Sequence, residues 1–256
     1  MRPRREPSFL RPAHRRLARG AVLLALVFAP PVPAQPAPGL YTVDSAASHV
    51  HVRVYRAGLL RGLGHNHIVA HRNITGCLRV APTLPDSVMA LEFPLAGLVV
   101  DDRALREAAG EAFPVPVPPE DIAATRRNML GADLLAAAAH PLATVTARRI
   151  AGQYPSVEAE IDIGLRGAQH VLAMPVHVRV DSNSIVAEGK REVHHAELGL
   201  EPFTAAFGAL RVAGAMDFEY RLAFRPADEE AGHSACERAA PVIDNDRIAR
   251  PDDTAK

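Results

Sequence analysis

The sequence contains no tryptophan, and its 256 residues include only eight phenylalanines and four tyrosines. Large aromatic rings normally supply much of the buried area of a core. With so few rings, mostly small aliphatic side chains must fill the interior. This composition favours a fold that keeps a cavity over one that is packed solid.

Cysteine is equally scarce, and recognised catalytic motifs are missing. Cys77 and Cys236 are the only two cysteines, which excludes a disulfide-rich scaffold but leaves a single bridge between them open. The sequence has no Gly-x-Ser-x-Gly, His-Glu-x-x-His or Cys-x-x-Cys motif and no phosphate-binding glycine loop. We therefore expect a protein without enzymatic activity and without a cofactor.

No apolar run is long enough to span a bilayer, which needs about 20 residues. Seven of the first twenty residues are arginine, and the short apolar run of residues 21–29 follows them. This order is typical of an export signal. We expect a signal peptide over residues 1–34, cleaved before Gln35, and a periplasmic or secreted protein with no membrane span after cleavage. An uncleaved anchor is the alternative.

Removal of residues 1–34 leaves 22 basic and 28 acidic residues, a net charge of −6. Nucleic-acid binding requires a basic surface, so this charge excludes a nucleic-acid partner. Residues 40–226 suffice for one domain with a full core. The polar composition of residues 227–256 predicts a disordered C-terminal tail.

Period-two alternation dominates residues 40–226 and predicts seven or eight strands. Two helices are expected to interrupt them, over residues 101–110 and 119–139, with Asp101 and Asp102 capping the first. The pattern predicts an all-β fold with one or two short helices, either an antiparallel barrel or a sandwich. Three apolar rows are expected to form the core, and in a barrel they would line a ligand cavity: Val50, Val52, Val54, Met89, Leu91, Phe93, Phe218, Tyr220 and Leu222.

Five of the twelve histidines fall within two neighbouring predicted strands. His49 and His51 share one face of the first strand, and His65, His67 and His71 share one face of the second. If the strands pair as a hairpin, all five imidazoles could lie on one surface. Imidazole is a common ligand for zinc or copper, so a metal site is an alternative hypothesis. Otherwise these side chains cap loops, hydrogen-bond to backbone carbonyls, or lie on a solvated strand face opposite the valines.

Four short motifs, in this order, resemble the YceI-like family of lipocalin-like, polyisoprenoid-binding periplasmic proteins. They are Tyr-Thr-Val-Asp at residues 41–44, Arg-x-Asn-Met-Leu at 126–130 leading to His140-Pro141, Ile-Asp-Ile-Gly-Leu-Arg-Gly at 161–167, and Glu-Leu-Gly-Leu-Glu-Pro-Phe at 197–203. The resemblance implies an eight-stranded antiparallel barrel that holds a long apolar chain and has no catalytic residues.

Together these observations predict an exported, non-enzymatic protein that binds a long-chain apolar or isoprenoid-type lipid inside a β-barrel. The partner is then a lipid ligand, and a homodimer is compatible with the sequence. The alternative function is a periplasmic metal-binding domain that uses the histidine cluster.

Overall fold

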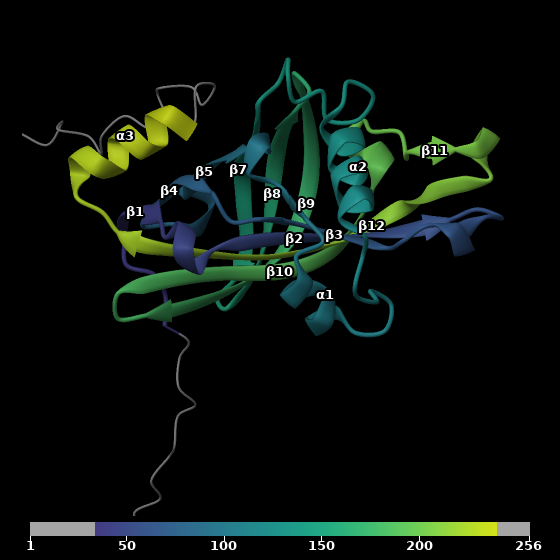
Figure 1. Cartoon of the computed structure of the whole chain (residues 1–256). Coiled ribbons are helices and arrows are strands. Elements are labelled where there is room, and N and C mark those ends of the chain that lie inside the picture. The colour runs from purple at the N-terminus through teal and green to yellow at the C-terminus, as the bar shows by residue number, and fades with distance from the viewer. Residues whose placement is uncertain (1–33, 240–256) are drawn as a thin grey trace, which may run out of the picture. The chain divides into compact units, whose positions relative to one another are not determined.

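Twelve β-strands form one antiparallel sheet within residues 34–239, the part of the chain that the computed structural model describes (Figure 1). Residues 1–33 of the predicted signal peptide and residues 240–256 of the predicted tail lie outside it. The strands are β1 (Gly39–Val43), β2 (His49–Ala57), β3 (His67–His71), β4 (Thr75–Val80), β5 (Val88–Pro94), β6 (Val99–Val100), β7 (Leu142–Gln153), β8 (Ser156–Leu165), β9 (Ala168–Asp181), β10 (Ser184–His194), β11 (Thr204–Ala205) and β12 (Leu210–Pro226).

Eight of these strands close a ring in the order β1, β4, β5, β7, β8, β9, β10 and β12, because β12 pairs back onto β1. Residues 211–221 of the long β12 pair instead with β2, and β3 and β6 extend the wall beyond β2. Closure pairs the edges that an open sheet would expose. The predicted antiparallel eight-stranded barrel is confirmed.

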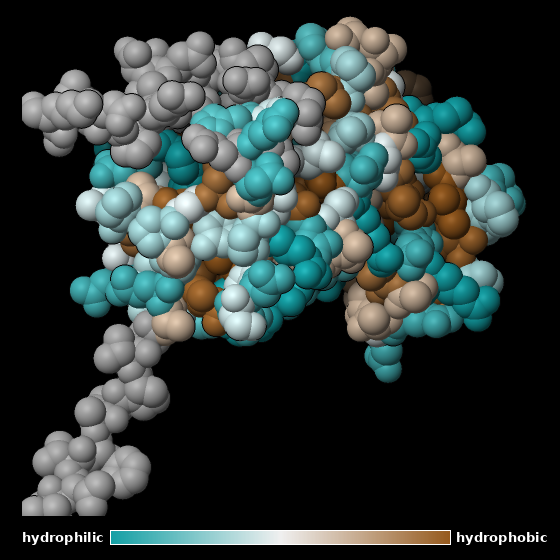
Figure 2. Space-filling view, turned by 90° about the vertical axis from the view of Figure 1, so that its left-hand side faces the viewer, coloured by the Kyte–Doolittle hydropathy of each residue, from teal (hydrophilic) through white to brown (hydrophobic). Residues whose placement is uncertain are grey.

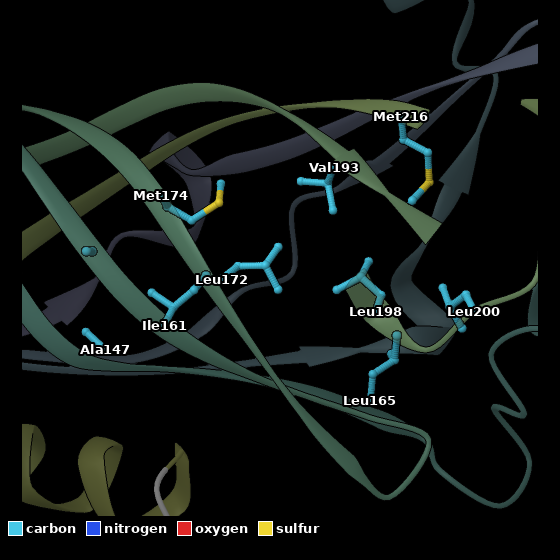
Figure 3. Close-up of a cluster of buried hydrophobic side chains, with 10 residues drawn as sticks. Ala147, Ile161, Leu165, Leu172, Met174, Val193, Leu198, Leu200 and Met216 are labelled. Atoms are coloured by element: carbon cyan, nitrogen blue, oxygen red, sulfur yellow. The ribbon is translucent and has the colours of Figure 1, made fainter. Parts of the chain in front are cut away.

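Alternation along the strands sends apolar side chains into the barrel. In the pairing of β2 with β12, Val52 lies opposite Phe218 and Val50 opposite Tyr220, so all four side chains share the inner face. Figure 3 shows one of the two large buried clusters inside, with Ile161, Leu172 and Val193 converging from β8, β9 and β10.

Two helices, α1 (Arg103–Ala109) and α2 (Pro119–Leu130), follow β6. The Asp102 side chain caps α1 by accepting from the Leu105 backbone N–H at 3.1 Å, as predicted. Proline and two acidic residues open α2, and Gly131 caps its end. The predicted extension to residue 139 is wrong, because the chain turns after Gly131 and Ala136 takes a positive φ of 47°.

The third helix, α3 (Glu229–Ala239), corrects the prediction of a wholly disordered tail. A disulfide joins Cys236 of α3 to Cys77 of β4. Leu40, Ala90 and Ala235 pack around the bond on the outside of the barrel. On that side of the molecule, hydrophilic residues dominate and apolar residues are visible mainly in hollows between them (Figure 2). The polar composition of this segment predicts disorder because it has little apolar area to bury. The disulfide to Cys77 nevertheless attaches α3 to the barrel.

Candidate ligand-binding site

The barrel encloses a cavity of about 590 Å³. Ligand pockets typically measure roughly 300–1,000 Å³. Small side chains on several strands, among them Ala147 of β7, Ala159 of β8 and Ala187 of β10, line the wall and leave this space. The structure places all nine residues of the predicted apolar rows at the cavity wall: Val50, Val52, Val54, Met89, Leu91, Phe93, Phe218, Tyr220 and Leu222.

The inner wall of the cavity consists almost entirely of aliphatic and aromatic side chains. Tyr220 presents its ring to the cavity, while its hydroxyl donates a hydrogen bond to the Pro175 carbonyl. Burial raises the pKa of Tyr220 to about 12, so the phenol is neutral at physiological pH. Such a wall accommodates an apolar chain and disfavours a charge, because burying an unpaired charge is costly.

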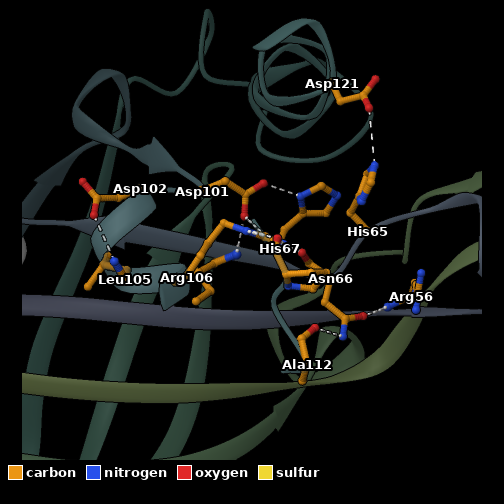
Figure 4. Close-up of polar contacts among 12 residues, drawn as sticks. Arg56, His65, Asn66, His67, Asp101, Asp102, Leu105, Arg106, Ala112 and Asp121 are labelled. Carbon is orange, nitrogen blue, oxygen red and sulfur yellow. Dashed lines mark hydrogen bonds and ion pairs between the residues drawn. The ribbon is translucent and has the colours of Figure 1, made fainter. Parts of the chain in front are cut away.

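One end of the cavity is polar. His67, the first residue of β3, and His65, just before it, lie there, and Asp121 and Asn128 of α2 lie opposite them. His65 Nε2 lies 3.4 Å from Asp121 Oδ2, and this contact connects the β3 side of the cavity to α2 (Figure 4). We call these residues, together with Arg56, Thr125 and Arg211, the polar rim. The cavity is therefore amphipathic: its interior is apolar and the end at the polar rim is polar.

A buried network fixes His67 in this rim. Its Nδ1 lies 2.6 Å from Asp101 Oδ2, and Asp101 Oδ1 accepts from Arg106 Nη1 at 2.5 Å. The side chains of Asp101 and Arg106 are 0% and 1% exposed. Arg106 also donates to the backbone carbonyls of Asn66 and Pro114, both at 2.7 Å. The guanidinium is thus well satisfied although it is buried.

Asp101 is held ionised by these contacts. Burial alone would raise its pKa, but hydrogen bonds from His67, the Ile68 backbone N–H and Arg106 outweigh burial and lower the pKa below its usual value. A carboxylate can only accept, so His67 donates Nδ1–H to Asp101. In the neutral ring, Nε2 is then left as an acceptor at the polar rim. The ring is oriented to accept from a hydroxyl, or to donate once it is protonated.

Solved structures of other proteins share this architecture. BcnA of Burkholderia cenocepacia aligns over 71% of this chain and 98% of its own length, at 14% identity and a TM-score of 0.52. A polyisoprenoid binding domain from Saccharophagus degradans, implicated in plant cell wall breakdown, aligns over 73% and 98%, at 15% identity and a TM-score of 0.50. A YceI protein of Campylobacter jejuni aligns over 62% and 85%, at 6% identity and a TM-score of 0.46.

The fold is YceI-like. The resemblance predicted from four short motifs is thus confirmed at the level of the fold. By sequence, no family model and no curated protein matches the chain. None of the helices within residues 34–239 is long and apolar enough to cross a membrane.

The expectation that all five histidines share one surface of the YceI-like barrel is wrong. Val54 pairs with His67 and Val50 with His71, so the histidine face of β3 joins the valine face of β2. His65, His67 and His71 line the cavity. The rings of His49 and His51 stack 4.4 Å apart, and these residues alternate with the cavity-lining valines of β2. Within residues 34–239, no group of three or more His, Cys, Asp or Glu side chains is arranged to hold a metal ion.

His71 has a structural role in the barrel wall. Its side chain is buried, its Nε2 lies 2.8 Å from the Pro94 carbonyl oxygen, and its ring packs edge-on against Phe93. A carbonyl can only accept, so Nε2 carries the proton. The bond joins β3 to Pro94 at the end of β5.

Asp101 and Arg106 are two site residues that the sequence did not reveal. The sequence predicts that both acidic residues before α1 cap the helix, but only Asp102 has that role, while Asp101 turns inward with a positive φ of 57°. An arginine in a short helix carries no sequence signal of burial. His67 in an alternating strand and an Asp-Asp pair were the available hints, but they are 34 residues apart and only the fold brings them together.

Proposed function

We propose that this protein is an exported carrier of a long-chain amphiphile of the isoprenoid type, and that it catalyses no reaction. The apolar chain lies in the barrel, in contact with the nine wall residues, and the polar head lies at the rim beside His67. The single observation that carries this proposal is the 590 Å³ apolar cavity that ends in a polar rim.

The fold of a polyisoprenoid binding domain supports the ligand class. The arginine-rich start and short apolar run support export to the periplasm or the exterior. A carrier is useful there because long prenyl chains do not dissolve in water, and burying them removes their apolar area from it.

The expected affinity follows from the length of the chain. At about −0.3 kcal/mol per heavy atom, a chain of some twenty carbons gains roughly −6 kcal/mol. That corresponds to a dissociation constant of roughly tens of micromolar. Tighter binding has to come from the head group, for which His65, His67 and Asn128 provide the polar partners. A head with a hydroxyl suits the acceptor Nε2 of His67.

Retinol tests this proposal directly, because it is a fluorescent isoprenoid alcohol of suitable length. We expect the full chain to bind it in vesicle-free buffer and Ala159→Phe to bind it at least tenfold more weakly, because Ala159 lines the cavity and the added ring fills it. Glu158→Gln, at an exposed position of the same strand, is the matched control and should bind as the wild type does. Equal binding by Ala159→Phe and the control, with both folded, would exclude the lumen as the site.

A further inference from the structure

Two neighbouring turns at one end of the molecule expose a group of large apolar side chains. Leu59 and Leu63, in the turn between β2 and β3, are 95% and 76% exposed. Phe207, in the turn before β12, is fully exposed, and Leu60 and Phe203 are partly exposed beside them. Single exposed apolar residues are ordinary, but a contiguous group of them marks an interaction surface. We call residues 56–64 and 203–211 the apolar tip.

The two turns form one structural unit. The Leu60 backbone N–H donates to the Ala209 carbonyl at 2.8 Å. Gly58 has a φ of 90°, and a Cβ there would collide with that same carbonyl, so glycine permits the close approach. Strand β2 pairs with β12 up to the tip, where Ala57 lies opposite Arg211. In Figure 1 these strands project from the barrel at the end opposite α3.

The tip is positively charged, whereas the rest of the exported chain is acidic. It contains Arg56, Arg61 and Arg211 and no aspartate or glutamate, although residues 35–256 carry a net charge of −6. Exposed leucine and phenylalanine surrounded by arginine is the composition of segments that lie in the interface of an anionic bilayer. A surface that binds another protein has no need to exclude acidic residues, whereas one that binds an anionic bilayer does.

The tip is also continuous with the ligand cavity. Leu63, Phe203 and Leu210 belong both to the tip and to the cavity wall, as do Arg56 and Arg211 of the polar rim. An amphiphile that leaves the lumen past these residues therefore meets the exposed side chains of the tip next. The surface lies where a carrier has to contact the membrane that supplies or receives its ligand.

We propose that the apolar tip docks on the surface of an anionic lipid bilayer, with Leu59, Leu63 and Phe207 inserted among the lipids. The cavity then opens toward the bilayer and exchanges its ligand there without passage through water. The exchange rests on the proposed carrier function, but the docking does not. The occupant of this surface is thus a membrane, and not a second copy of the chain or another protein.

The absence of tryptophan provides a clean probe. In Phe207→Trp the indole is the only one in the chain, and we expect its emission to shift to the blue when vesicles of phosphatidylcholine and phosphatidylglycerol are added. Val171→Trp is the matched control, because Val171 is 56% exposed but lies in β9, outside the tip. Its emission should stay unchanged. No shift for Phe207→Trp, or equal shifts for both variants, would overturn the proposal.

Vesicle flotation of the full chain measures the binding itself. Loss of two inserted side chains in Leu59→Ser/Phe207→Ser should lower binding by about tenfold or more. Arg61→Gln should lower it about fivefold on phosphatidylglycerol-containing vesicles and leave binding to pure phosphatidylcholine unchanged. Val171→Ser should bind as the wild type does. A wild type that does not float with anionic vesicles contradicts docking, and so does a dimer in vesicle-free buffer that the double variant disrupts.

Retinol binding in vesicle-free buffer separates the two proposals. The double variant should still bind retinol as the wild type does, because Leu59 and Phe207 do not line the cavity. If vesicles bind and retinol does not, the carrier function fails and the docking surface stands. If retinol binds and vesicles do not, the docking surface fails and the carrier function stands.

Discussion

The guanidinium of Arg106 lies 2.5 Å from the carboxylate of Asp101, with both side chains almost completely shielded from solvent. This pair holds the carboxylate that orients His67 at the polar rim. A histidine facing an apolar cavity would otherwise be free to turn. The ion pair thus couples the stability of the barrel wall to the geometry of the ligand site.

Neutralising Asp101 should destabilise the fold strongly. In Asp101→Asn the buried guanidinium loses its counter-charge, and breaking such a pair costs about 3–5 kcal/mol. Urea unfolding at neutral pH measures the free energy of unfolding of the variant and of the wild type. The control is Arg103→Gln, which removes an exposed ion pair to Glu107 and should cost less than about 1 kcal/mol. A loss of that small size for Asp101→Asn would show that the buried pair does not support the fold.

His67 should discriminate ligands by their head group. In His67→Leu the loss of one hydrogen bond, worth about 0.5–1.5 kcal/mol, should weaken retinol binding roughly two- to twelvefold. Squalene has no hydroxyl, so its ability to compete for the cavity should be unchanged. Competition titrations with both ligands measure this difference. Equal losses for retinol and squalene would mean that the substitution only perturbs the cavity.

The stacked histidines of β2 should make stability depend on pH. Burial lowers the pKa of both His49 and His51 below the ordinary value of 6.5, and the charge of His49 lowers that of His51 further. Below about pH 6.5 the unfolded chain binds protons at these sites more readily than the folded protein, so the free energy of unfolding falls as the pH falls.

Urea unfolding between neutral and mildly acidic pH tests this dependence. The double variant His49→Gln/His51→Gln should show a shallower decline, since it has no imidazole to protonate at these positions. Val171→Gln, which adds the same side chain at an exposed position of β9 and removes no titratable group, is the control and should keep the wild-type slope. A slope that is the same in the double variant and the wild type would assign the acid sensitivity to other groups.

The disulfide should account for a measurable part of the stability. Cys77 and Cys236 are 159 residues apart, so the bond restricts a long loop of the unfolded chain. Cys236→Ser should lower the free energy of unfolding by about 2–5 kcal/mol. Reductant should lower the wild type to the same value and leave the variant unchanged. Ser234→Ala, within the same helix, is the control, and an equal loss there would indicate helix packing in place of the bond.

Local alternation predicted much of the barrel, because it depends only on each strand. The parity of Val50, Val52 and Val54 indicates one face, and the structure places that face toward the cavity. Which alternate residues of the next strand share this inner face depends on the length and conformation of the intervening turn. For that reason the sequence did not show that His67 faces inward with Val54. Closure of the ring came from the family resemblance, since pairing of β1 with β12 has no local signal.

Contacts between distant segments account for the rest. Asp101 and Asp102 are adjacent and chemically identical, yet one caps α1 and the other pairs with Arg106 and His67. Helix α3 has a polar composition that predicts disorder, and the bond to Cys77 attaches it. In both cases the residue that determines the outcome is distant in sequence, His67 for Asp101 and Cys77 for α3, and only the fold brings it close.

The central claim is that the barrel lumen holds an apolar chain, and organic extraction followed by mass spectrometry tests it most directly. The full-length protein, purified without detergent from the cells that produce it, should yield about one long-chain prenyl lipid per barrel, and Ala159→Phe should yield almost none. Recovery of no lipid from the wild type, together with failure of the extracted protein to take up retinol, would contradict the account.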